Sequence, residues 1–345
     1  MSRETGRNKG AELIRIIASI LVILGHVSAH RTSVSPFALC CNMLAFNGVA
    51  LFFMLSGAFY LAPERQYGVR HAVLHRFVRL FALYYFWKAF YLAVSLFTNK
   101  TQVTDIKEQI LLPMIRHAGH YHLWFLPAMA IVSLLFPLVR DGAAKKPVLR
   151  LYLVVFFAVA ILLPTLFLYE FPFKYLLMEW FTLYDFLYFA GYLGYVLLGR
   201  YLYAYARSFS PFVCALLYAA AVLSYLFACT TAIGKSTFPG SGYLGLSTPF
   251  SLHVFFVSAA AFTTVLRMKQ ESRLFRGKTL QTAAGLTFGI YLLHPLFLDA
   301  LANLSLPDVL PVPLMIPLLV VFLFVVSGAV TAVLQRIPFV RALVR

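Results

Sequence analysis

The sequence predicts an all-α integral membrane protein, a bundle of about ten transmembrane helices with both termini in the cytoplasm. Of the 345 residues, 61% are hydrophobic and only 12% are charged, whereas soluble proteins are closer to half apolar and a quarter charged. Too little polar surface remains to cover a water-soluble body of this size, so most of the exterior must face lipid. The apolar runs are long and continuous, which favours helices over the short alternating strands of a barrel.

Ten apolar stretches each have about the length that a helix needs to cross the hydrocarbon layer. They are roughly residues 14–33, 42–62, 77–98, 122–139, 151–170, 182–199, 210–230, 248–266, 280–300 and 312–334. No internal repeat, low-complexity tract or long linker separates them. We therefore expect one transmembrane domain over residues 1–345.

The distribution of basic residues predicts the orientation of these spans. Lys and Arg number 29, and 22 of them lie in the terminal segments and alternate loops that a cytoplasmic N-terminus would place inside. Six lie in the opposite loops, and Lys88 lies within a span. This bias is the positive-inside pattern, so the net charge of +17 indicates membrane topology and lipid contact rather than a nucleic-acid partner.

The residues "VSA" at 27–29 follow a basic start and an apolar run, as at a signal-peptidase site. Cleavage there would leave nine spans and an N-terminus outside. Arg15 and His26 make the apolar segment a poor signal core, so we expect it to remain as the first span.

The first span holds two side chains that hydrocarbon disfavours, Arg15 and His26. Eleven residues of α-helix advance about 16.5 Å and rotate about 20° past three full turns, so both side chains share a face. His30 follows four residues later on roughly the same stripe. Arg15 could simply snorkel to the cytoplasmic surface, and a single intramembrane histidine could be a packing residue. Ionisable groups at this depth usually line a pathway, however, and the pair on one face favours a functional role.

The spacing of Arg15 and His26 resembles the signature of the membrane-bound acyltransferase family 3. Further blocks resemble motifs of this family in its own order, over most of the chain. They are "GVALFFMLSGAFYL" (48–61), "RFVRLFALYYFW" (76–87), "HLWFLPAM" (122–129) and "FGIYLLHPLF" (288–297). Many members carry an acidic residue before the FF of the second-helix block, where this chain has Val49 and Ala50. The resemblance is strongest to the surface-polysaccharide O-acyltransferases.

The resemblance implies an enzyme of the bacterial cytoplasmic (inner) membrane that moves an acyl group from cytoplasmic acyl-CoA to a hydroxyl group. The acceptor would be an extracytoplasmic surface polysaccharide or a lipid-linked glycan. Acetyl-CoA is the default donor and succinyl-CoA an alternative, each as a co-substrate, with no bound cofactor. His26 would be the general base, because the unperturbed pKa of imidazole lies close to neutral. A covalent acyl-histidine step is an alternative to direct transfer.

Arg76 and Arg79 lie three residues apart at the start of the third span, on one helical face. They could be ordinary cytoplasmic anchors, but a guanidinium is also well shaped to grip phosphates. The resemblance implies that they hold the coenzyme A end of the donor, with Arg15 helping to hold or orient it.

His122 and Trp124 lie at the outer end of the fourth span, and His294 lies in the outer half of the ninth. Together the histidines suggest a polar vestibule in which His294 or His122 orients the acceptor or stabilises the oxyanion. His117, His120 and His122 share one short loop without a cysteine or acidic ligand, so we expect no metal site.

Two further patterns have alternative interpretations. Ser56–Gly57 lacks the G-x-S-x-G elbow of serine hydrolases and fits close helix packing instead. Glu170, Glu179, Asp185 and Asp299 fall near outer ends, where they could contact a sugar or only water. A polysaccharide exporter or flippase without acyl-transfer chemistry is the alternative function. Its usual paired, Pro-broken helices are not evident in this sequence.

Overall fold

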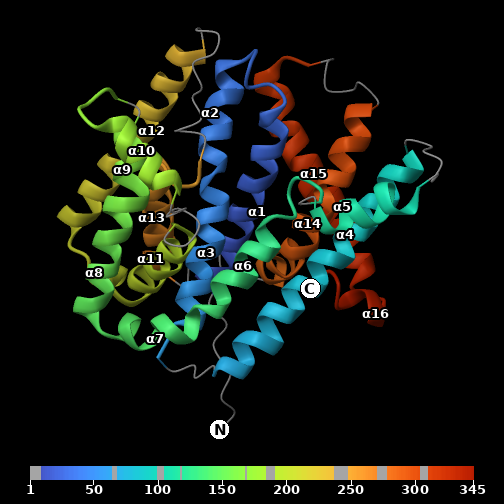
Figure 1. Ribbon diagram of the computed structural model, residues 1–345, viewed down its shortest axis with the longest axis horizontal. Helices are drawn as coiled ribbons and strands as arrows, with labels where there is room; N and C mark the ends of the chain where they lie inside the picture. The colour runs from blue at the N-terminus through green and yellow to red at the C-terminus, as the bar shows by residue number, and fades with distance from the viewer. Residues whose placement is uncertain are drawn as a thin grey trace. The chain divides into compact units, whose positions relative to one another are not determined.

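The computed structural model describes residues 9–63, 68–98, 105–116, 119–167, 169–183, 191–236, 248–269, 278–303 and 310–345 (Figure 1). Every regular element in these ranges is a helix, which confirms the predicted all-α class. The elements are α1 (Lys9–Ala29), α2 (Pro36–Ala45), α3 (Asn47–Tyr60), η1 (His71–Phe77), α4 (Val78–Thr98), η2 (Lys107–Leu111), α5 (Leu112–Arg116), α6 (Phe125–Leu134), α7 (Phe136–Ala144), α8 (Lys146–Phe156), η3 (Phe157–Leu162), α9 (Leu163–Leu166), α10 (Lys174–Leu183), α11 (Tyr192–Tyr205), η5 (Ala206–Ser208), α12 (Pro211–Ser236), α13 (Leu252–Arg267), α14 (Lys278–Asn303), α15 (Val312–Leu334) and α16 (Pro338–Arg341).

Seven helical stretches in the described ranges are long and apolar enough to cross a membrane. They are Lys9–Ala29, Pro36–Tyr60, His71–Thr98, Lys146–Leu166, Pro211–Gly234, Thr279–Ala302 and Val312–Leu334. The helices α6 and α7 cover the fourth expected span and meet at an angle of 62°, and counting them as one broken span raises the number to eight. The protein is therefore a multi-pass membrane protein.

The other two expected spans have shorter helices. The sixth, 182–199, includes residues 184–190, which lie outside the described ranges, and α11 begins at Tyr192. The eighth, 248–266, corresponds to α13, an apolar helix of 16 residues. The count of about ten spans and the cytoplasmic position of both termini remain predictions.

The chain separates into two compact units. Unit 1 comprises Met1–Ala62 and Gly142–Arg345, and unit 2 comprises Pro63–Asp141. Each is described by itself below, and the expected single domain over residues 1–345 remains a prediction.

In unit 1, α1 packs against α2, α3, α14 and α15. Figure 1 shows this first helix in blue between the α2–α3 pair and the orange α14. Buried apolar side chains from four of these helices form one core: Ile23, Val27, Ala38, Ile290, Leu298, Met315, Ile316, Val320 and Leu323. The first helix is thus held by elements from both ends of the sequence.

The helices α3 and α11 approach each other closely because two glycines face the neighbouring backbone. A Cβ atom on Gly57 would lie 1.7 Å from the carbonyl oxygen of Val196, and one on Gly199 would lie 1.9 Å from that of Met54. Only glycine fits at such distances, as at other small-residue crossings in membranes. The expected packing role of Ser56–Gly57 is confirmed for Gly57.

In unit 2, the π-helical segment η1 leads directly into α4, which packs against α6. Lys88 in α4 is buried, and its Nζ donates a hydrogen bond to the carbonyl oxygen of Met114 at 2.8 Å. Its charge is thus satisfied by a carbonyl dipole within the same unit.

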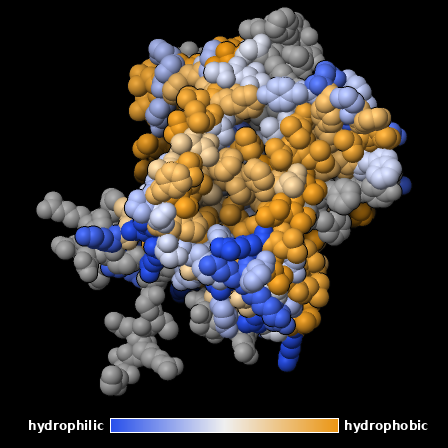
Figure 2. Space-filling view, turned by 90° about the vertical axis from the view of Figure 1, so that its left-hand side faces the viewer, coloured by the Kyte–Doolittle hydropathy of each residue, from blue (hydrophilic) through white to orange (hydrophobic). Residues whose placement is uncertain are grey.

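The outer face of unit 1 is apolar where α8 and α12 present it. Large exposed side chains there include Leu151, Val154, Phe212, Leu216 and Leu223. Figure 2 looks onto this side and shows apolar side chains across it, with hydrophilic side chains gathered below them. Apolar exposure of this extent is expected where helices contact lipid.

Candidate functional site

The structure brings together two of the histidines singled out from the sequence. His26 in α1 and His294 in α14 stack with their ring centroids 5.3 Å apart and their planes 28° from parallel. His294 is fully buried, whereas His26 is half-buried. One ring of the pair is therefore enclosed by protein, and the other is partly exposed on the surface of α1.

The position of His294 determines its tautomer. Its Nδ1 lies 3.0 Å from the carbonyl oxygen of Ile290, one turn earlier in α14. A carbonyl oxygen only accepts hydrogen bonds, so Nδ1 carries the proton and Nε2 is the basic nitrogen of the neutral ring. Proline follows at position 295 and cannot donate to the carbonyl oxygen of Tyr291, which weakens the helix beside the histidine.

The helix α2 supports α1 next to His26. The amide nitrogen Nδ2 of Asn42 donates to the carbonyl oxygen of Gly25 at 3.1 Å and lies 3.3 Å from the hydroxyl oxygen of Ser28. A Cβ atom on Gly25 would lie 3.1 Å from that of Ala45, so the two helices are in close contact there. These contacts fix the segment of α1 that carries the histidine.

Arg15 and His26 lie in one uninterrupted helix, so the spacing expected from the sequence is present. Arg15 is exposed, and its guanidinium carbon is 5.9 Å from the ring centroid of Phe59 in α3. At this distance the ring face attracts the cation. Arg15 therefore lies against the last part of the motif at residues 48–61.

Arg76 and Arg79 belong to unit 2. Arg76 is half-buried at the end of η1, and its guanidinium carbon is 5.1 Å from the ring centroid of Phe136. Arg79, on the first turn of α4, is exposed. The two arginines differ in exposure although their spacing predicts a shared face, because Arg76 is half-buried against an aromatic ring and Arg79 is exposed.

His122 and Trp124 also lie in unit 2, in the turn before α6. His122 is buried, and its Nδ1 lies 3.0 Å from Nδ1 of His120. The His120 ring stacks on Tyr91 at 4.2 Å. Trp124 is half-buried, and its ring centroid is 6.3 Å from that of Phe125. This aromatic and imidazole cluster was not expected from the sequence, since Tyr91 comes from a different helix.

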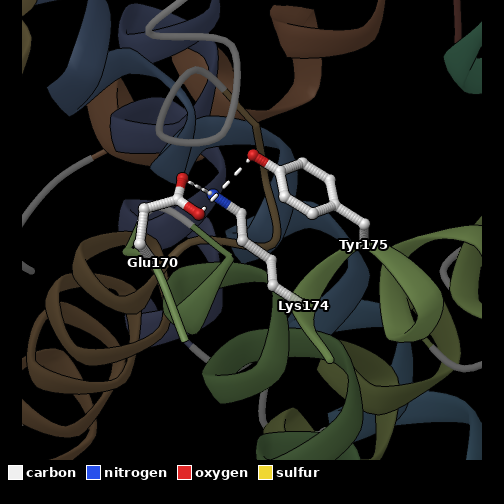
Figure 3. Close-up of polar contacts among 3 residues, drawn as sticks. All are labelled: Glu170, Lys174 and Tyr175. Atoms are coloured by element: carbon white, nitrogen blue, oxygen red, sulfur yellow. Dashed lines mark hydrogen bonds and ion pairs between the residues drawn. The ribbon is translucent and has the colours of Figure 1, made fainter. Parts of the chain in front are cut away.

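The acidic residues near the expected outer ends have different settings. Figure 3 shows the carboxylate of Glu170 accepting a hydrogen bond from Lys174 Nζ at 2.7 Å and, at 3.5 Å, one from the hydroxyl of Tyr175. Glu179 is exposed, Asp299 is half-buried, and Asp185 lies outside the described residues. Glu170 is thus paired with a lysine four residues later in the chain.

Within the described ranges, no three His, Cys, Asp or Glu side chains lie close enough to hold a metal ion. His117 lies outside these ranges, so the expected lack of a metal site remains a prediction.

His253 and Arg200 are buried polar residues of unit 1 that were not singled out from the sequence. His253 in α13 is buried, with Nε2 3.0 Å from the carbonyl oxygen of Met43 and Nδ1 3.0 Å from the hydroxyl of Ser251. Because both of its ring nitrogens have partners within the protein, this histidine joins α13 to α2 rather than facing substrate. Arg200 in α11 is buried as well. A polar residue inside an apolar span is the signal that could have identified His253, whereas Arg200 follows the end of the sixth expected span, 182–199.

The comparison with protein families gives one match. A family model described as an acyltransferase domain, of the type-3 group, matches residues 8–335. No curated protein and no solved structure matches the chain. The match covers α1 through α15 and so includes every site residue described above.

Proposed function

Because this chain belongs to the membrane-bound acyltransferase family 3, we propose that it moves an acyl group from cytoplasmic acyl-CoA to a glycan hydroxyl. The acceptor is an extracytoplasmic surface polysaccharide or a lipid-linked glycan, and the enzyme works in the bacterial cytoplasmic membrane. Acetyl-CoA is the proposed donor, with succinyl-CoA as the alternative. The observation that carries the proposal is the stacked His26–His294 pair.

The half-buried His26 acts as the general base. As the acceptor oxygen attacks the thioester carbonyl carbon, a ring nitrogen of His26 takes the hydroxyl proton. The carbon–sulfur bond then breaks, and the protonated imidazole returns this proton to the leaving thiolate of coenzyme A. General-base assistance of this kind typically contributes about 10²- to 10⁴-fold to the rate.

The buried His294 orients the acceptor. In the neutral ring, Nε2 is the acceptor nitrogen because Nδ1 donates to Ile290. It can therefore accept a hydrogen bond from the incoming hydroxyl, whereas stabilising an oxyanion would require a donor. The geometry thus favours the orienting role over the oxyanion role, and the rigid contact with Ile290 sets the direction of the ring.

The arginines bind the donor. Arg15 lies eleven residues before His26 on the same helix, and Arg76 and Arg79 provide two guanidinium groups at the start of the third span. Guanidinium groups form bidentate contacts with phosphate oxygens, and coenzyme A carries several phosphates. His122 and Trp124 remain weaker candidates for the acceptor side.

The test is the variant His26→Ala. Acyl transfer should fall by about 10²- to 10⁴-fold while membrane insertion and the thermal midpoint stay unchanged, because only the base is lost. Turnover of radiolabelled acetyl-CoA by purified protein and mass spectrometry of surface glycans measure the effect. The matched control is His30→Ala, since His30 is exposed just beyond the same helix.

A His26→Ala protein that modifies glycans at the wild-type rate would exclude His26 as the base. A wild-type protein that leaves acetyl-CoA intact but moves glycan across liposomes would identify an exporter instead.

A further inference from the structure

Arg200 is a buried cation without a partner in the described residues. Its side chain is 8% exposed, and its Nε is buried without a hydrogen-bond partner. Across the described ranges, no hydrogen bond, ion pair or ring contact involves this guanidinium.

Other basic residues at the same end of α11 have partners. The Nε of Arg207 donates to the carbonyl oxygen of Leu266 at 3.1 Å. Arg267 donates through Nη1 to the carbonyl oxygens of Ala206 and Phe209 at 3.0 and 2.9 Å. Lys146 lies 4.6 Å from the ring centroid of Tyr205. Arg200 is therefore the exception among them.

A guanidinium keeps its positive charge inside a protein. Leaving such a charge without a counter-charge is strongly unfavourable. An anion from outside the chain would remove this cost, so the arrangement indicates a binding residue rather than a structural one.

Arg15 and the turn of α11 that follows Arg200 lie near the same aromatic side chain, Phe59 of α3. Arg200 follows Gly199, whose backbone is pressed against Met54 of α3. One turn later, the Tyr203 ring lies 6.2 Å from Phe59, and the Arg15 guanidinium lies 5.9 Å from the same Phe59 ring. Phe59 therefore contacts both Arg15 of α1 and Tyr203 of α11.

We propose that Arg200 binds a phosphate group of the acyl-CoA donor, as a second guanidinium at the end of unit 1 where Arg15 lies. This inference rests on the proposed function, which supplies the phosphate-bearing donor. A planar guanidinium can hold two oxygens of one phosphate, and burial strengthens that pairing. In the sequence, Arg200 is one of the 22 basic residues in segments expected on the cytoplasmic side, directly after the sixth expected span (182–199).

The experiment compares Arg200→Met with the wild-type protein in detergent, with coenzyme A as the probe. Without ligand, the methionine variant should have a higher thermal midpoint, since an unpaired buried charge has been replaced by an apolar side chain. Its dissociation constant for coenzyme A should rise by about 10- to 100-fold, the usual loss for a hydrogen bond to a charged group. Calorimetry and thermal melting give both quantities.

Two further variants complete the comparison. Arg200→Lys keeps the charge but loses the planar fork, so its affinity should fall between the other two proteins. Arg150→Met removes one positive charge from an exposed position of α8 and should leave both the midpoint and the affinity unchanged.

An Arg200→Met protein that binds coenzyme A as tightly as wild type would overturn the inference while leaving the proposed function intact. A lowered ligand-free midpoint would overturn it too, by giving Arg200 a structural role. Added phosphatidylglycerol tests the other source of a phosphate group. If Arg200→Met abolishes the rise in thermal midpoint caused by this lipid but leaves coenzyme A binding unchanged, the site belongs to a lipid headgroup. A wild-type protein that binds no coenzyme A would refute the proposed function itself.

Discussion

His26 and His294 have the same side chain but different surroundings. His294 is enclosed and held by the carbonyl oxygen of Ile290, while His26 is half-buried beside the segment that Asn42 supports. A fixed ring suits orientation of a hydroxyl, and a partly open ring suits exchange of a proton. The environments of the two residues, rather than their identity, assign the proposed roles.

The variant His294→Asn separates orientation from structure. The amide nitrogen of asparagine can replace Nδ1 as donor to Ile290, but asparagine has no acceptor atom in the position of Nε2. We expect a thermal midpoint close to wild type and acetyl-CoA turnover with glycan lowered by about 10²-fold or more. His294→Ala, which also leaves the Ile290 contact unmade, is the comparison. Full activity in the asparagine variant would reduce His294 to a packing residue.

Arg15→Lys tests whether the arginine does more than anchor the first helix. Lysine keeps the positive charge but loses the planar fork that matches a phosphate. We expect the KM for acetyl-CoA to rise by about tenfold, as for the loss of one charge-assisted hydrogen bond. Steady-state kinetics with purified protein measure it. If KM and kcat stay the same, Arg15 serves only as an anchor.

At the scale of elements, the crossing of α3 and α11 depends on backbone contact rather than on large apolar side chains. Gly57 and Gly199 each face the backbone of the other helix. Lipid tails are as apolar as leucine, so close packing of small residues supplies much of the attraction between membrane helices. The same crossing positions Arg200 and Tyr203 relative to Phe59.

Gly57→Ala should therefore destabilise the protein. The new Cβ would meet the carbonyl oxygen of Val196 at 1.7 Å, and the helices would have to separate. We expect a loss of about 1–3 kcal/mol or more, seen as a lower thermal midpoint. Gly285→Ala in α14 is the control, because its Cβ would meet nothing within 4 Å. It should gain about 0.5–1 kcal/mol from helix propensity. An equal effect of both substitutions would refute the role of the crossing.

At the scale of the whole molecule, basic residues and helix number constrain the topology together. The excess of Lys and Arg in alternate loops predicts that both termini are cytoplasmic. Two termini on the same side of the membrane require an even number of spans. The ten expected spans, or the eight counted with the bent α6–α7 pair, would meet this requirement, and seven would not. The shorter helices at the sixth and eighth expected spans, α11 and α13, therefore bear directly on the topology.

Reporter fusions to the C-terminus decide between these counts. Alkaline phosphatase needs disulfides and so becomes active only outside the cytoplasm, whereas a fluorescent protein folds inside. We expect a phosphatase fused after Arg345 to be inactive and a fluorescent protein fused there to be bright. Matching fusions at the N-terminus report on the other end. Opposite results for the two termini would establish an odd number of spans.

The sequence by itself determined the membrane class, the helical fold, the family and the spacing of Arg15 and His26. The class, the fold and the spacing follow from composition or from the pattern of residues within a few turns of one helix. The family follows from the resemblance of ordered motif blocks along most of the chain. Only the tertiary structure decided that His294 is the histidine that meets His26, that two glycines bring α3 against α11, and that Arg200 is buried rather than solvated in a loop. These depend on which side chains from distant helices pack together, and helical periodicity gives the face of a residue but not the helix that covers it.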